Sequence, residues 1–103
     1  MPSIPALFGW ALAAAWPHGG KAQDLIEYGE YLSSQCSSCH RLDAFEGAIP
    51  PLGHLPKDYF IVAMNEYRSG RRDNPAMVSV ANALSAEEVE ALAAYYASIR
   101  KKK

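Results

Sequence analysis

The chain has 103 residues, a hydrophobic fraction of 50% and a formal net charge of -1. This length suits one domain, and the hydrophobic content excludes a disordered chain. The near-neutral charge, without a nucleic-acid recognition motif, argues against a nucleic-acid-binding protein. Two cysteines are too few for a scaffold of several disulfides, so a domain this small needs other support for its core.

An apolar segment, IPALFGWALAAAW, covers residues 4–16 without a charge. It is too short to span a bilayer comfortably, and its length suits the apolar part of a secretory signal. No Lys or Arg precedes it, so an ordered N-terminal extension is the alternative. Residues 17–20, PHGG, then interrupt the pattern. We therefore predict a signal peptide or extension over residues 1–22, a domain over residues 23–103, and no stable membrane span.

Three amphipathic helices are predicted in the remaining sequence, which shows no convincing strand alternation. The first covers residues 24–35, with Asp24 as a candidate N-cap. The second covers residues 57–69, and Gly70 suits its C-cap. The third begins at Ser85, whose hydroxyl can form a capping box with Glu88. These helices predict an all-α domain.

Residues 36–40 read Cys-Ser-Ser-Cys-His, which is the c-type haem attachment pattern. Positions three and four apart share one face of a helix, so Cys36, Cys39 and His40 can approach one side of a porphyrin. The two thiols would bind the haem vinyl groups as thioethers, and the imidazole would coordinate the iron. A covalent haem would also complete the core of a small domain.

Other interpretations of these five residues are weaker. A redox-active dithiol needs a βαβ context that the predicted helices lack. A structural zinc site needs four ligands, whereas the remaining imidazoles are His18 and His54 and there is no second cysteine pair. A simple disulfide is similarly disfavoured. The pattern therefore favours haem attachment.

Residues 24–99 resemble the class I cytochromes c, particularly the short cytochrome c4-like and c553-like domains and the cytochrome subunit of flavocytochrome c sulfide dehydrogenases. The resemblance lies in GEYLSSQCSSCH, IPPL, YFIVAMNEYRSGRRDNPAM and LSAEEVEALAAYYASI. It implies an all-α class I cytochrome c fold, with three main helices around one covalent haem c. It also implies that Gly29 allows the N-terminal helix to pack closely against Tyr95 and Tyr96 of the C-terminal helix.

The second axial ligand of the iron has three candidates. An electron carrier needs both axial positions filled, and a thioether raises the reduction potential. Met77 follows Asn74-Pro75 in a connection predicted to be irregular, where the resembled families place their methionine ligand. Met64 lies within a predicted helix, where methionine usually fills the core, and His54 lies in a loop. We therefore predict that His40 and Met77 coordinate the iron, with Met64 and His54 as alternatives to Met77.

A proline after the haem motif has a further role in the resembled proteins. Its carbonyl accepts the second ring proton of the haem histidine and fixes the orientation of the ring. Pro50 and Pro51 are both candidates, and an ordinary turn is the alternative. Many members of these families have glycine directly after the haem histidine, whereas this chain has Arg41, so the local backbone or a propionate contact is expected to differ.

The expected function is outer-sphere electron transfer by a monohaem cytochrome, not an enzyme, in the periplasm or another extracytoplasmic space. The resemblance makes a flavoprotein sulfide dehydrogenase a candidate partner. The alternative is a haem-based ligand-binding or sensor domain with an open or labile distal site. Two basic groups are candidates for steering an acidic partner, for a propionate contact or for plain solvated surface. These are Arg68, Arg71 and Arg72, and Lys101, Lys102 and Lys103.

Overall fold

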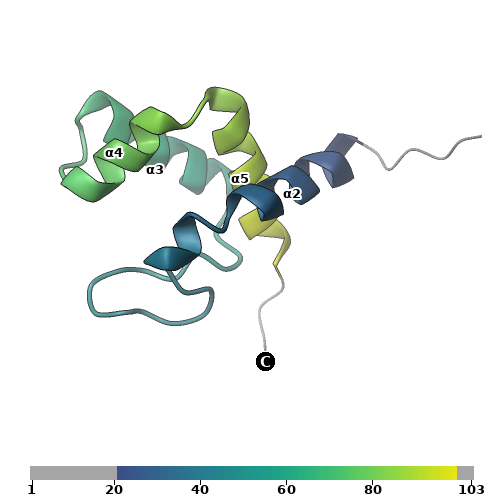
Figure 1. Cartoon of the computed structure of the whole chain (residues 1–103), viewed down its shortest axis with the longest axis horizontal. Helices are drawn as coiled ribbons and strands as arrows, with labels where there is room; N and C mark the ends of the chain where they lie inside the picture. Colours follow the sequence, from purple (N-terminus) through teal and green to yellow (C-terminus); the bar gives the residue numbers. More distant parts are fainter. Residues whose placement is uncertain (1–20, 100–103) are drawn as a thin grey trace, which may run out of the picture.

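The computed structural model describes residues 21–99, which form an all-helical domain (Figure 1). The elements in chain order are α2 (Lys21–Leu32), the 3-10 helix η2 (Cys36–Ser38), α3 (Lys57–Ser69), α4 (Pro75–Ala83) and α5 (Ala86–Ser98). The predicted all-α class is confirmed. Within residues 21–99, no helix has the length and apolar character needed to cross a membrane.

The predicted signal segment lies almost wholly outside the described residues. Residues 1–20 are not described, and the last two residues of the predicted segment form the start of α2. That helix begins at Lys21, so the prediction that Asp24 is its N-cap is wrong. Asp24 instead lies in the first turn, where a carboxylate interacts favourably with the helix dipole.

The end of α2 also differs from the prediction. The helix ends at Leu32 rather than at residue 35, and a turn of 3-10 helix follows. Two consecutive serines explain the early end, because serine hydroxyls compete for backbone carbonyls. The Ser33 hydroxyl donates to the Glu30 carbonyl at 2.6 Å, and the Cys36 amide donates to the Ser33 carbonyl at 2.9 Å.

The local signals at the other two predicted helices are confirmed. α3 has the predicted bounds, and Gly70 follows it with a φ of 85°, in the left-handed region that glycine adopts at low cost. The capping box at the start of α5 is present. The Glu88 amide donates to the Ser85 hydroxyl at 3.1 Å, and the Ser85 amide donates to the Glu88 carboxylate at 2.8 Å.

The connection between α3 and α5 was predicted to be irregular, and this prediction is wrong. It contains α4, a helix of nine residues. The Asn74 side chain caps it by accepting from the Met77 amide at 3.1 Å, and Pro75 occupies the first helical position. Asparagine at the N-cap and proline at the first position are both favoured helix starts. Met77 therefore lies in the first turn of a helix.

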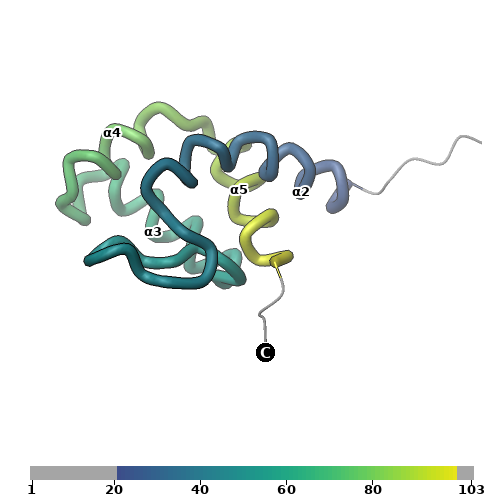
Figure 2. The backbone as a smooth tube through the Cα atoms, turned by 60° about the horizontal axis from the view of Figure 1, so that its bottom comes forward, coloured from purple at the N-terminus to yellow at the C-terminus, as the bar shows by residue number. Residues whose placement is uncertain are grey.

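The most extensive contact between helices joins α2 and α5, which lie side by side in both views (Figures 1 and 2). Gly29 is buried at this contact, and a Cβ atom there would overlap the Ala91 carbonyl and lie 2.7 Å from the Tyr95 Cβ. The predicted close packing of Gly29 on Tyr95 is confirmed. Tyr96 instead points into the core, with its ring centroid 5.6 Å from that of Phe60.

The core contains eleven buried apolar side chains, which come from the four α-helices, the residue after α4 and the long loop. They are Leu32, Leu52, Phe60, Met64, Ala81, Leu84, Val89, Ala91, Leu92, Ala93 and Tyr96. The loop between η2 and α3 extends away from the helices and then returns beside the haem-attachment motif (Figure 2). Backbone hydrogen bonds fix its return, from Leu52 to the Arg41 carbonyl at 2.9 Å and from Gly53 to the Leu42 carbonyl at 2.8 Å.

Candidate haem site

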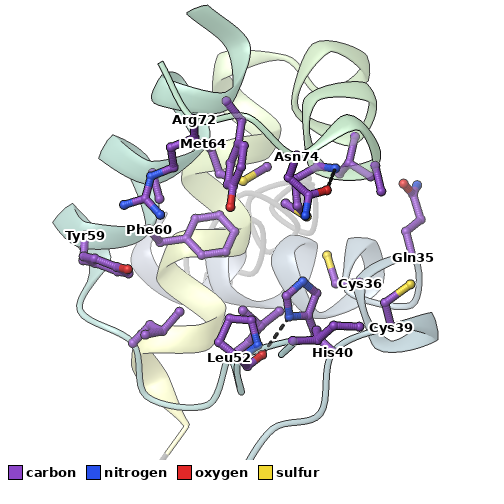
Figure 3. A pocket seen from close by; sticks show the side chains of 18 of the residues that line it. Gln35, Cys36, Cys39, His40, Leu52, Tyr59, Phe60, Met64, Arg72 and Asn74 are labelled. Atoms are coloured by element: carbon purple, nitrogen blue, oxygen red, sulfur yellow. Dashed lines mark hydrogen bonds between the residues drawn. The ribbon is translucent and has the colours of Figure 1, made fainter. Parts of the chain in front are cut away.

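A cavity of about 340 Å³ lies between the Cys36–His40 turn, the returning loop, α3 and α4 (Figure 3). Most of its wall is apolar. The apolar residues are Ala48, Ile49, Leu52, Leu55, Phe60, Ala63, Met64, Ala76, Met77 and Val80. A wall of this kind excludes water and suits a flat, largely hydrophobic macrocycle.

Cys36, Cys39 and His40 all line this cavity, as the attachment motif predicted. The backbone is helical there, since the amides of Cys39 and His40 both donate to the Cys36 carbonyl, at 3.1 and 2.8 Å. This single turn brings the two sulfur atoms and the imidazole to one wall (Figure 3). Both cysteines are free thiols. The residues present therefore fit a haem with two thioether bonds.

The His40 ring is held by the returning loop. Its Nδ1 lies 2.8 Å from the Pro50 carbonyl, so Nδ1–H donates and Nε2 keeps a free lone pair for a metal. Pro50 lines the cavity, whereas Pro51 lines a second groove on the other side of His40. Of the two candidate prolines, Pro50 makes the hydrogen bond.

Cys36 occupies a less polar environment than Cys39. Burial raises the pKa of the Cys36 thiol, and a hydrogen bond with the Tyr96 hydroxyl lowers it in part. Burial likewise raises the pKa of Tyr96 above its ordinary value. Both shifts follow from the burial of these two side chains. Within residues 21–99, no group of three or more His, Cys, Asp or Glu is placed so that it could hold a metal ion.

Two of the three candidate second ligands lie at the cavity. Met77 lines it from the first turn of α4, and Met64 lines it from the middle of α3. Figure 3 shows Met64 and Asn74, the cap residue of α4, across the cavity from His40. His54 is exposed and lines the second groove with Pro51. The cavity thus brings both methionines, and not His54, near the haem-attachment motif.

Arg72 is a cavity residue that the sequence did not single out from its neighbours. Its Nε donates to the Glu66 carboxylate at 2.7 Å, and its guanidinium lies 5.9 and 5.6 Å from the ring centroids of Tyr59 and Tyr67. The hydrogen bond with Glu66 raises the pKa of Arg72 above its ordinary value. The cavity wall therefore holds one positive charge in a defined position.

Sequence periodicity could have found part of this arrangement. Tyr59 and Tyr67 are eight residues apart in α3 and so share one face of the helix. The return of Arg72 onto that face depends on the turn at Gly70, where the amides of Arg71 and Arg72 both donate to the Glu66 carbonyl, at 2.8 and 3.2 Å. No local pattern predicts that return.

No protein-family model matches this chain. It is similar to the thiosulfate dehydrogenase electron acceptor of Stutzerimonas stutzeri, with 40% identity over 62 residues, covering 57% of this chain and 29% of that protein. It is also similar to the thiosulfate dehydrogenase electron acceptor of Thiomonas intermedia, with 29% identity over 101 residues, covering 95% of this chain and 42% of that protein. The chain thus spans less than half the length of either relative.

A third relative is closer in length. The cytochrome subunit of sulfide dehydrogenase from Chlorobaculum tepidum is 30% identical over 76 residues, which cover 72% of this chain and 68% of that protein. The match agrees with the all-helical fold and with the Cys-Ser-Ser-Cys-His motif at the cavity wall. This chain belongs to the c-type cytochromes, in the family of the cytochrome subunit of sulfide dehydrogenase.

Proposed function

We propose that this chain is a monohaem electron-transfer protein, with one haem c attached at Cys36 and Cys39 and its iron coordinated by His40 and Met77. One observation carries the proposal. The attachment motif and Met77 line the same apolar cavity, and the Pro50 carbonyl leaves the Nε2 of His40 free to bind a metal. The haem supplies a ferric/ferrous couple when it is bound.

The residues of the chain have separate tasks in this function. The Pro50 carbonyl fixes the tautomer and orientation of the His40 ring and makes the imidazole a stronger donor. A thioether from Met77 favours the ferrous state and so raises the reduction potential. Phe60 and the other apolar wall residues exclude water, which limits solvent reorganisation during electron transfer. These tasks suit an electron carrier rather than a domain that binds an external ligand at the iron.

The proposal extends to the location and the partner. Residues 1–22 act as the export signal, because their apolar segment has the length of a signal and carries no charge. The cytochrome acts in the periplasm, where it accepts electrons from a dehydrogenase of an inorganic sulfur compound. The support is that two relatives are named as electron acceptors of thiosulfate dehydrogenase and one as the cytochrome subunit of sulfide dehydrogenase.

Intact mass and a haem stain test this proposal together. The full chain is expressed in a host that attaches c-type haem to exported proteins, and the product is separated on a denaturing gel. We expect a haem-stained band and the mass of residues 23–103 plus one haem. A matched variant with Cys36→Ala and Cys39→Ala should lose the stain and the added mass. A wild-type product with the mass of its amino acids alone would contradict covalent attachment, and one that retains residues 1–22 would contradict signal cleavage.

A further inference from the structure

The short helix α4 carries Met77 and is held at both ends. At its start, the Asn74 side chain accepts a hydrogen bond from the Met77 amide itself at 3.1 Å. At its end, the guanidinium of Arg68 in α3 donates to the Ala81 carbonyl from Nε at 3.3 Å and from Nη2 at 3.1 Å, and Nη2 also donates to the Leu84 carbonyl. One arginine thus adds hydrogen bonds to carbonyls at the end of α4, where the Ala81 carbonyl also accepts from the Leu84 amide at 3.4 Å.

The environment of Arg68 differs from that of the other two arginines nearby. Arg72 forms an ion pair with Glu66, and Arg71 is exposed. None of the ion pairs formed by residues 21–99 includes Arg68, which is half-buried between α3 and α4. Its charge faces the carbonyl end of α4, where the helix dipole favours a cation. Arg68 therefore donates hydrogen bonds to backbone carbonyls rather than pairing with an acidic side chain.

The contact at Ala81 bears directly on Met77. Met77 and Ala81 are four residues apart and share one face of α4, and Leu84 is the C-cap residue that directly follows the helix. Ala81 is fully buried and Leu84 is 8% exposed. This face therefore cannot slide against the core without loss of packing or of the Arg68 hydrogen bonds. Because α4 has only nine residues, fixing its C-terminal end also limits movement of its first turn, which carries Met77.

We propose that Arg68 is the positioning residue of Met77: its hydrogen bonds to the Ala81 and Leu84 carbonyls fix α4 on α3 and keep the Met77 sulfur at the cavity. The inference rests on the proposed function, in which Met77 is the second ligand. The fork of a guanidinium reaches two carbonyls at once, whereas a lysine ammonium is a single point charge. Lysine could therefore replace only part of this contact.

Competition for the iron tests this inference. The haem-loaded ferric protein is titrated with imidazole, and loss of the sulfur-to-iron charge-transfer band is followed. In Arg68→Met, we expect imidazole to bind about ten- to a hundredfold more tightly, as loss of a charged hydrogen-bond donor between packed elements implies. Arg68→Lys should fall between this variant and the wild type. The control is Arg71→Met, which removes an exposed arginine three residues away and should leave the affinity unchanged.

The same measurements separate positioning from plain stabilisation. If Arg68 only stabilises the fold, its variants will unfold at lower denaturant concentration but show wild-type imidazole affinity while folded, and the inference is then overturned. If Arg68→Met does not fold, Arg68→Lys alone must bind imidazole more tightly than the control. A wild-type protein without the charge-transfer band would overturn Met77 ligation and this inference with it. If only the inference about Arg68 fails, the wild-type protein still shows the sulfur-to-iron charge-transfer band.

Discussion

Two methionines line one cavity, and their surroundings differ at the scale of single residues. Met64 is 5% exposed, lies in the middle of α3 and belongs to the core cluster of buried side chains. Met77 is only partly buried and lies in the first turn of α4, where its amide is held by Asn74. A buried mid-helix methionine is suited to filling space, while one at a helix start beside a cavity is available as a ligand.

This difference predicts opposite results for the same conservative change. Met77→Leu should abolish the sulfur-to-iron charge-transfer band and allow rapid carbon monoxide binding to the ferrous protein, because leucine has no sulfur to coordinate iron. Met64→Leu should keep the band and lower the free energy of unfolding by less than about 1.5 kcal/mol, because the exchange nearly conserves volume. Absorption spectra and denaturant titrations of both variants check this. Loss of the band in Met64→Leu alone would assign the ligand to Met64.

At the scale of helices, the crossing of α2 and α5 depends on the missing side chain of Gly29. The backbone of α5 approaches so closely that a Cβ atom at Gly29 would overlap the Ala91 carbonyl. Neither that carbonyl nor the Tyr95 Cβ is the flexible end of a side chain, so the helices must move apart to admit a methyl group. The crossing also places Tyr96 beside Phe60 and Cys36, so it supports the cavity wall.

Gly29→Ala should therefore destabilise the protein although alanine is the better helix former. Overpacking costs about 1–3 kcal/mol, which exceeds the gain of up to about 1 kcal/mol in helix propensity. The measurement is the free energy of unfolding of the haem-loaded protein in denaturant. Gln23→Ala is the control, since it changes an exposed position on the same helix and should be neutral or slightly stabilising. Equal stability of Gly29→Ala and the wild type would show that the helices separate at no cost.

At the scale of the whole molecule, the charges are unevenly distributed. All 11 acidic residues lie within residues 21–99, together with six of the ten basic residues, and the other four basic residues are residues 100–103. The described domain is therefore acidic, and the end of the chain is basic. Complementary charge on a partner accelerates encounter and makes the association rate depend on salt.

The proposed electron donor can be tested on this basis. Purified thiosulfate dehydrogenase with thiosulfate should reduce the haem-loaded cytochrome at a rate proportional to the enzyme concentration. We expect that rate to fall by about tenfold from low to high ionic strength, as for electrostatically steered pairs. Stopped-flow absorption measures it, with thiosulfate alone as the control and sulfide dehydrogenase with sulfide as the alternative donor. If neither enzyme reduces the cytochrome, the partner proposal fails and the haem proposal stands.

The sequence alone determined the features that depend on neighbouring residues. The haem-attachment pattern, the bounds of α3, the left-handed Gly70 and the capping box of Ser85 and Glu88 each involve groups within about one helical turn. Hydrogen bonds between residues three or four apart depend on the residue types at those positions, so they can be predicted from the sequence. The start of α4 was equally local, because Asn74-Pro75 is a helix-start signal. It was missed because nine residues are too few to show clear periodicity.

Only the tertiary structure decided which distant residues meet. Pro50 rather than Pro51 bonds His40 across ten residues, and Arg68 reaches carbonyls thirteen and sixteen residues away. These contacts depend on the path of the loop and on how α3, α4 and α5 pack, because nonlocal contacts are set by the whole arrangement of burial rather than by spacing. The sequence therefore identified the Cys-Ser-Ser-Cys-His motif, and the fold determined what surrounds these residues and holds them in place.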